Sequence, residues 1–309
     1  MGLFSNKKKL CPLCGGPTPR LLATKVEDMP LCKDCADKID LPSGALERMS
    51  LEDLRQYMAF YDQNQWARLT FTETYRYSFG FLSDVLVLDG QHRLLRLKGY
   101  DGALVLEAQH LAAFRITEDE RVLFEGKGGV LTCHPSTVPE RVQALAPAIE
   151  RFNIRHEEYE RMEEMERHMG RRDDRPLPPE PAFDTAAPLH QFHVELTLNH
   201  PYWKSFRAKV NAPDFSKFHP SAADYLREYE EKAEELHQLA ANLLHIMDPN
   251  GREQHPDTVQ AAQTSAAAPA ADAPAADAVA EIQRYKGLLD AGVITEAEFT
   301  AKKRQLMGI

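Results

Sequence analysis

Short runs of branched and aromatic residues, separated by turn signals, fill the chain from Thr70 to His134. Runs of Val, Leu, Phe and Tyr are typical of strands, and the Asp89–Gly90 pair between two of them is a hairpin signal. The predicted strands are residues 85–88, 93–97, 103–107, 110–117, 121–125 and 130–134. Two further strands, 191–199 and 204–210, follow after an interruption, and apolar and polar residues alternate in the first of them.

Apolar residues at helical spacing predict helices before and after these strands. Residues 43–69 form the first helical segment, in which Ser50 is the expected N-cap. Residues 221–247 form a long second helix with one apolar stripe, which we expect to pack on the strands. Short antiparallel strands followed by one amphipathic helix predict a small barrel or sheet that this helix closes.

A polar insertion, at about residues 137–188, separates the two groups of strands. Ser136 or Thr137 is expected to cap a helix there, and Pro147 is expected to kink or end that helix. A charged stretch, 151–172, comes next, and its glutamate run is more typical of a solvated helix face than of an acid catalyst. The proline-rich segment 175–188 is predicted to be extended.

The pattern changes again near the C-terminal end. Residues 249–278 are poor in large apolar side chains, and Ala262–Ala278 consists almost wholly of Ala, Pro, Asp, Thr and Ser, which predicts a disordered linker. Residues 279–309 then regain helical signals: Gly292 ends a first helix, and Thr295 with Glu298 forms a capping box for a second.

Two helices of this length cannot bury enough apolar surface to be stable alone. We therefore expect residues 279–309 to pair with another copy of the chain or to dock on a partner, and docking back onto the middle domain is the alternative. The side chains expected to make this contact are Ile282, Tyr285, Leu288, Leu289, Ile294, Phe299 and Leu306.

Composition narrows the class of protein. The chain has 309 residues, of which 43% are hydrophobic, and a formal net charge of −10. The acidic balance argues against a protein that coats nucleic acid or anionic membrane over its whole surface. No run approaches the ~20 apolar residues of a membrane span, and the lysines at 7–9 are not followed by the apolar core of a secretory signal. The expected compartment is the cytoplasm.

Four of the five cysteines form two tight pairs, Cys11/Cys14 and Cys32/Cys35, separated by seventeen residues. Two C-x2-C pairs at such a spacing are typical of a zinc site with four thiolate ligands, and the glycines after Cys14 suit the tight turn of a zinc knuckle. We expect one structural Zn²⁺, with no open position for a catalytic water. Two disulfides, free thiols and a redox C-x-x-C are the alternatives.

Other candidate residues do not form a catalytic set. Cys133 ends a predicted strand and is expected to be a buried structural cysteine. His190 and His193 would point to opposite faces of a strand, so a second metal there is not expected. His156 and Glu160 lack the second histidine of a zinc-protease helix in their own segment. We therefore expect a protein that is not an enzyme.

The C-terminal residues resemble the short C-terminal (SHOCT) domain. The resemblance is carried by Leu289, Gly292, Ile294, Thr295, Glu298 and Phe299, followed by Lys302 and Lys303. It implies a tethered helical module for oligomerisation or interaction. The N-terminal part, through its four paired cysteines and the stretch 51–66, resembles a bacterial zinc-ribbon domain of unknown function that is often joined to a short C-terminal domain. The strands and helix of the middle resemble a pleckstrin-homology-like region loosely.

These observations predict an α+β protein of several domains. The expected parts are a zinc-ribbon or treble-clef-like module (1–42), connecting helices (43–69), a β-rich domain with its helical insertion (70–248), the linker (249–278) and the two-helix module (279–309). The expected function is non-enzymatic interaction or assembly. Nucleic-acid binding by the zinc module, helped by Lys7–Lys9, Arg20 and Lys25, and lipid binding by the middle domain are the alternatives.

Overall fold

The structure is a computed structural model that describes residues 5–80, 85–169, 178–215 and 219–255. The chain divides into two compact units, residues 1–256 and 257–309. The second unit lies outside the described residues, and so do most of the predicted linker and both predicted C-terminal helices. Every helix and strand that the structure describes therefore belongs to the first unit.

Small antiparallel hairpins build the N-terminal module. Strand β1 (Ser5–Leu10) pairs with β2 (Pro17–Pro19), and β3 (Lys25–Val26) pairs with β4 (Met29–Pro30). A helical turn, α1 (Lys33–Ala36), follows the second hairpin. Each hairpin therefore leads into or encloses one cysteine pair.

Helices connect this module to the sheets. After the 3-10 turn η1 (Leu46–Arg48) come α2 (Leu51–Gln63) and α3 (Gln65–Thr70). Ser50 caps α2 as predicted: its hydroxyl accepts from the Asp53 N–H at 3.1 Å, and the Asp53 carboxylate accepts from the Ser50 N–H at 3.0 Å. The buried side of α2 carries Leu54, Tyr57 and Tyr61.

The first of two larger sheets contains β5 (Tyr75–Ser78), β6 (Val85–Asp89), β7 (Leu94–Arg96) and β8 (Leu106–Glu107), all antiparallel in chain order. The predicted hairpin joins β6 and β7. Asp89 is buried at its turn, where its carboxylate accepts hydrogen bonds from the backbone N–H groups of Thr72, Gln91 and His92. The side chain thus replaces backbone partners that the turn leaves unpaired.

The second sheet has six strands in the order β13-β12-β9-β10-β11-β14. Its strands are β9 (Leu111–Glu118), which follows the 3-10 turn η2 (Ala108–His110), β10 (Arg121–Lys127), β11 (Val130–Cys133), β12 (Gln191–Leu198), β13 (Ser205–Asn211) and β14 (Arg252–Gln254). The pairs are antiparallel except that β14 runs parallel to β11. Residues 252–254, which composition places in the linker, therefore belong to the sheet.

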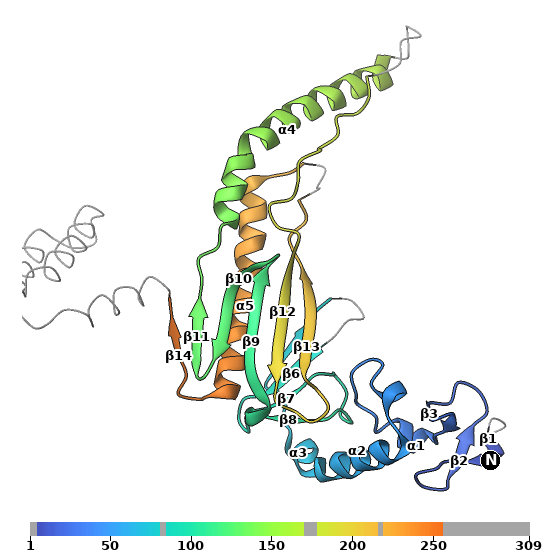
Figure 1. The fold of residues 1–309 in the computed structure, drawn as a ribbon. Coiled ribbons are helices and arrows are strands. Elements are labelled where there is room, and N and C mark those ends of the chain that lie inside the picture. Colours follow the sequence, from blue (N-terminus) through green and yellow to red (C-terminus); the bar gives the residue numbers. More distant parts are fainter. Residues whose placement is uncertain (1–4, 81–84, 170–177, 216–218, 256–309) are drawn as a thin grey trace, which may run out of the picture. The chain divides into compact units, whose positions relative to one another are not determined.

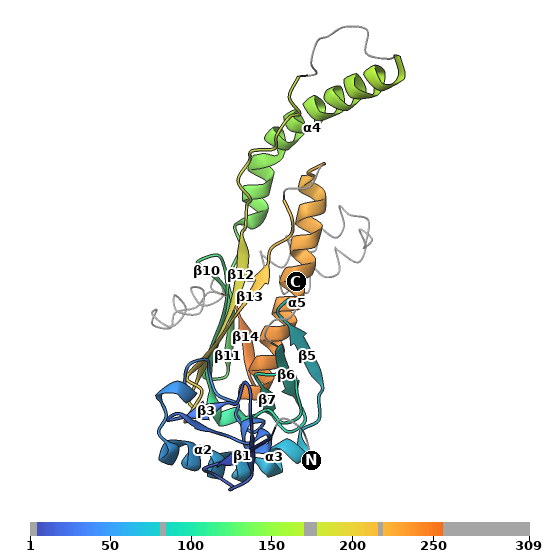
Figure 2. The same ribbon diagram turned by 90° about the vertical axis from the view of Figure 1, so that its right-hand side faces the viewer.

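The long helix α5 (Ala222–Met247) packs against β9, β10 and β11 and also contacts β6. Figure 2 shows its C-terminal half between the two sheets. The predicted apolar stripe is the buried face: Leu236, Leu239, Ala240 and Leu243 have essentially no exposed surface. Burying this stripe from both sides makes α5 the centre of the core.

Helix α4 (Val138–Met169) occupies the predicted insertion and leads away from the six-stranded sheet (Figure 1). The Ser136 hydroxyl accepts from the Val138 N–H at 3.0 Å at its start, as expected for a cap. The sequence predicts that Pro147 kinks or ends this helix: the helix does not end there but continues through it, and Figure 1 shows that α4 is bent. Buried Val142 and Ile149 on either side hold both halves, so packing offsets the hydrogen bond that proline removes.

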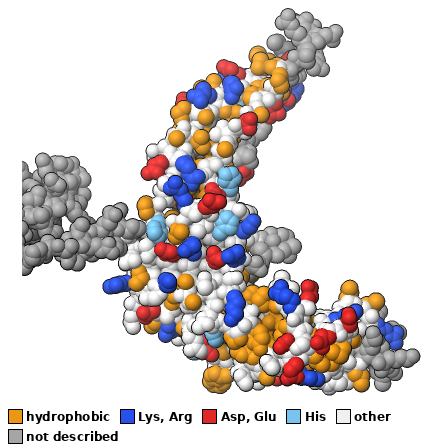
Figure 3. All heavy atoms as spheres, viewed as in Figure 1, with side chains coloured by type: hydrophobic (Ala, Val, Ile, Leu, Met, Phe, Trp, Pro, Cys, Tyr) orange, Lys and Arg blue, Asp and Glu red, His pale blue; other side chains and the backbone are white. Residues whose placement is uncertain are grey.

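The expected barrel is not found: neither larger sheet closes in the residues that the structure describes. Strands β13 and β14 lie at opposite edges of the six-stranded sheet, and α5 covers one of its faces instead of closing a cylinder. The described part is a mixed α+β structure with several open sheets. Figure 3 shows acidic and basic side chains interspersed along α4, as expected for a solvated helix face.

Candidate metal centre

The first cysteine pair lies in a tight turn between β1 and β2. The Cys11 N–H donates to the Gly16 carbonyl at 2.8 Å, and the Gly15 N–H donates to the Cys11 carbonyl at 2.8 Å. Gly15 has φ +71°, a conformation that costs glycine nothing. The Gly16 N–H points at Cys14 Sγ, 3.4 Å away, so the turn directs a backbone donor at a sulfur.

The second pair lies at the start of α1. Cys32 is its N-cap residue, and Cys32 Sγ accepts from the Cys35 N–H at 3.4 Å. The Ala36 N–H donates to the Cys32 carbonyl at 3.0 Å, which closes the turn. Both pairs thus use the two intervening residues to make a turn that brings their sulfurs to one side.

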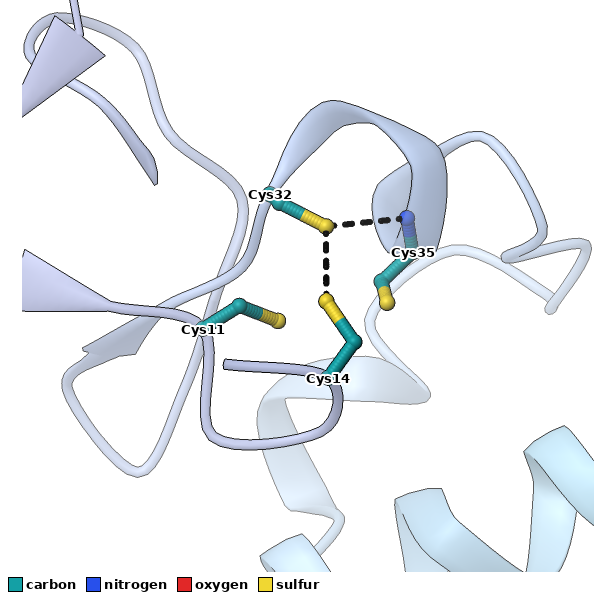
Figure 4. Close-up of side chains that lie close together, drawn as sticks. All are labelled: Cys11, Cys14, Cys32 and Cys35. Carbon is teal, nitrogen blue, oxygen red and sulfur yellow. Dashed lines mark hydrogen bonds between the residues drawn. The ribbon is translucent and has the colours of Figure 1, made fainter. Parts of the chain in front are cut away.

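The four sulfurs converge on one point (Figure 4). All four Sγ atoms lie within 4.8 Å of one another, and Cys14 Sγ is 3.4 Å from Cys32 Sγ. Tetrahedral zinc with Zn–S bonds of ~2.3 Å places its sulfurs about 3.8 Å apart. No disulfide joins these four cysteines, and their arrangement could hold a metal ion.

Burial and backbone donors act in opposite directions on these thiols. Burial raises the pKa of Cys11. Backbone hydrogen bonds at Cys32, Cys14 and Leu13 lower it by a larger amount, so that the net pKa is about 7. Burial, followed by hydrogen bonds to the neighbouring thiols, raises the pKa of Cys35 well above its ordinary value. Four adjacent thiolates repel one another, so a divalent cation would stabilise the deprotonated set and release protons on binding.

Asp40, near the end of the cysteine module, connects it to the rest of the first unit. Its N–H donates to the Tyr57 hydroxyl at 2.7 Å, and its carboxylate accepts from the Leu104 N–H at 2.8 Å and lies 3.0 Å from Lys98 Nζ. Its carbonyl accepts from Trp203 Nε1 at 3.1 Å. Asp40 is 1% exposed, so these contacts replace solvent completely. Sequence reasoning missed it, because all these partners are distant in the chain.

The histidines singled out in the sequence are separated by the fold. His190 is exposed and lies 3.5 Å from Asp119, whereas His193 is half-buried within β12. His200 is buried beside His110, with ring centroids 4.9 Å apart. Burial lowers the pKa of His200 to about 4, with smaller contributions from His110 and Lys204, so this ring is neutral near pH 7.

Two further groups of possible metal ligands appear only in three dimensions. Cys133 lies beside His237 and Glu253, and His156 and Glu160 lie beside His219. The second group supplies from a distant segment the histidine that the helix lacks in sequence. No local spacing signals the Cys133 group, because its residues lie on elements far apart in the chain, and none signals that His219 joins His156 and Glu160.

A hollow of about 780 Å³ lies beside α3 and the β6–β7 turn and is large enough to admit a small molecule. His92, Arg93 and Glu107 line it. His92 Nδ1 lies 2.8 Å from Asp89, the Arg93 guanidinium donates to the backbone carbonyls of Ile246 and Met247, and the Glu107 carboxylate accepts from Gln109 Nε2 at 3.1 Å.

Comparisons with known proteins bear on the far end of the chain. Residues 280–307 match the family model SHOCT, the short C-terminal domain. Comparisons with curated proteins and with solved structures find no match. The contact residues predicted there, from Ile282 to Leu306, lie outside the described residues. Within the described part, none of the helices combines the length and apolar character needed to cross a membrane.

Proposed function

We propose that this chain is a non-enzymatic interaction or assembly protein of the cytoplasm. A structural zinc ion on Cys11, Cys14, Cys32 and Cys35 holds its N-terminal module, and its C-terminal segment binds a second copy or a partner. The observation that carries the proposal is the convergence of four sulfurs within 4.8 Å, at protein-filled positions that suit a structural ion better than a reaction centre.

The match at residues 280–307 supports the second part of the proposal. Short helices need an external surface to complete a core. A low-complexity stretch precedes them, and a tether raises the effective concentration of a contact without fixing its geometry. Self-association and partner docking are both compatible with this arrangement.

Light scattering tests self-association. The full chain should have a mass above that of a monomer, and a chain that ends at Ala261 should be monomeric. Leu288→Asp with Phe299→Asp in the full chain should act like the truncation, because both residues belong to the predicted contact face. Gln283→Asp, on a polar position of the same segment, is the matched control and should keep the larger mass.

Partner docking is tested by recovery from native cells. Bait chains with and without residues 279–309 should retain different proteins, and the Leu288→Asp/Phe299→Asp chain should match the truncated bait. The proposal would be contradicted if every chain had a monomeric mass and if the baits with and without residues 279–309 retained the same proteins.

The two alternative functions lack comparable support. The barrel on which lipid binding would rest is absent from the described residues, where both larger sheets are open. Nucleic-acid binding by the cysteine module would show as a salt-dependent mobility shift with DNA or RNA. A shift that Lys7→Ala, Lys8→Ala and Lys9→Ala together abolish would replace the assembly proposal for the N-terminal end.

A further inference from the structure

Cys133, His237 and Glu253 come from three different elements and meet at one edge of the six-stranded sheet. Cys133 ends β11, His237 lies in the middle of α5, and Glu253 is the central residue of β14. Cys133 Sγ lies 3.1 Å from Glu253 Oε1, and His237 Nε2 lies 3.1 Å from Glu253 Oε2. One ligand atom from each residue falls within 4.8 Å of the others.

The strand register explains this meeting. Leu131 is paired with Glu253 in the parallel β11–β14 ladder, so their side chains share a face, and Cys133 follows on that same face two residues later. Leu131 and Cys133 are buried there, and α5 contacts β11. The glutamate therefore points toward the side of the sheet that α5 covers.

An aromatic ring and a further histidine lie next to the cluster. The ring of Phe124 lies 5.3 Å from the His237 ring, and Cys133 is 6% exposed. His255 Nε2 lies 3.6 Å from Glu253 Oε1, on the solvent side of the cluster. A buried thiol, a half-buried imidazole and an exposed carboxylate thus lie together at the sheet edge, and the His255 imidazole lies beside the carboxylate.

This donor set has a clear chemical preference. Cysteine sulfur, histidine nitrogen and carboxylate oxygen are the usual zinc ligands, whereas Mg²⁺ and Ca²⁺ favour oxygen alone. Three protein ligands leave a fourth tetrahedral position, which His255 or a solvent molecule would fill. We propose that Cys133, His237 and Glu253 form a second metal site, for a borderline divalent cation of the Zn²⁺ type, separate from the N-terminal cysteine centre.

A metal ion at this site would stabilise the docking of β14 on the sheet. That strand has three residues, two of them exposed, and pairs with the sheet along one edge. A strand so short has few contacts of its own, so a bond from Glu253 to an ion held by β11 and α5 would couple its docking to metal binding. The alternative is a hydrogen-bonded cluster that needs no ion.

Zinc stoichiometry of the full chain decides between these two. Chelator-treated protein, titrated with Zn²⁺ and freed of excess, should retain about two ions per chain when measured by elemental analysis. Cys133→Ser and His237→Gln should each retain about one. His134→Gln, which changes the histidine directly after β11 that lies beside Glu125, is the matched control and should match the parent chain.

The Cys32→Ser chain separates this proposal from the zinc centre proposed above. It should keep about one ion, and the double change Cys32→Ser/His237→Gln should keep none. A parent chain with one ion that Cys32→Ser removes and Cys133→Ser leaves in place would overturn the second site while sparing the first. Two ions in the parent, both retained by His237→Gln and Cys133→Ser, would overturn it equally.

Hydrogen exchange gives a readout that does not depend on counting ions. In the Cys32→Ser chain, added Zn²⁺ should slow exchange at the amides of residues 252–254, and Glu253→Gln should remove this effect. Glu253→Gln changes an exposed side chain at a sheet edge, so the fold should persist where a change at buried Cys133 disturbs it. Exchange in β14 that ignores Zn²⁺ would contradict the proposal.

Discussion

The cysteine module and the sheet that packs on α5 achieve their folds by different means. Among the module residues whose burial the structure describes, 10–42, the buried apolar ones are Cys11, Val26, Leu31, Cys32 and Leu41, so two of these five are themselves candidate metal ligands. Helix α5 alone buries eight residues, seven of them large. The contrast shows why one chain contains both: a short hairpin segment cannot exclude enough apolar surface from water, whereas a helix between two sheets can.

The largest expected effect comes from removing a ligand of the module. Cys32→Ser should release the N-terminal metal and unfold the cysteine module, because binding energy of such an ion is folding energy. The two sheets and α5 should stay folded. Amide exchange along the chain would show the loss of protection before residue 40 and its retention in β9 and β12. Loss of protection everywhere would mean that the two regions fold as one.

The converse change is in the apolar core. Phe192 is fully buried in β12 and stacks on Tyr229 of α5, with ring centroids 6.1 Å apart. Phe192→Ala should lower the free energy of unfolding of the sheet region by about 4 kcal/mol, the usual cost of such a cavity. Zinc retention at the cysteines should not change. Denaturant unfolding with metal analysis measures both, and loss of the N-terminal ion would contradict the expected independence.

Acid should act where the connecting helix α2 packs against the segment between β12 and β13. His200, whose pKa is lowered to about 4, packs against Phe60 of α2 with ring centroids 5.2 Å apart. The unfolded chain takes up this proton first as pH falls below ~6.5, so stability is lost between there and pH 4, where the folded state also protonates. The difference between the two pKa values corresponds to roughly 3 kcal/mol.

His200→Asn should remove that part of the acid sensitivity. An asparagine oxygen can still accept the N–H groups of Tyr202 and Trp203, which now donate to His200 Nδ1 at 3.3 and 3.1 Å. Urea unfolding at pH 7 and at pH 5 would measure the difference. An equal loss of stability in the parent and in His200→Asn would show that other groups dominate the acid response.

The smallest expected effect comes from changing Asp40, which connects the cysteine module to the rest of the first unit. Asp40→Asn keeps the shape of the side chain but removes its charge beside Lys98 and reduces its ability to accept from the Leu104 N–H. The unfolding free energy should fall by about 2 kcal/mol, as for a buried group that loses a charge-assisted partner. Asp62→Asn removes an exposed partner of Lys38, 2.9 Å away, and should cost much less. Equal effects would mean that Asp40 is not a specific link.

Local signals in the sequence account for much of the fold. The C-x2-C pairs, the Ser50 cap and the run of strands after Thr70 depend on neighbours in the chain, and the structure contains each of them. The failures share a different cause. Strand β14 forms because it pairs with the edge of β11, a strand far earlier in the chain. Cys133 and Glu253, which meet there, are 120 residues apart. The partners of Asp40 and the Cys133 cluster also depend on contacts between distant segments.

The contacts of Asp40 set a limit on chain length near the cysteines. Cys35 is positioned by the other three sulfurs, and Asp40 is positioned through its N–H, its carbonyl and both carboxylate oxygens by Tyr57, Trp203, Leu104 and Lys98. The segment between Cys35 and Asp40 is therefore held at both ends, and this constrains the number of residues that it can contain. Inserting a residue there would force the chain to bulge or to give up one anchor, whereas the exposed turn around Leu22 could lengthen freely.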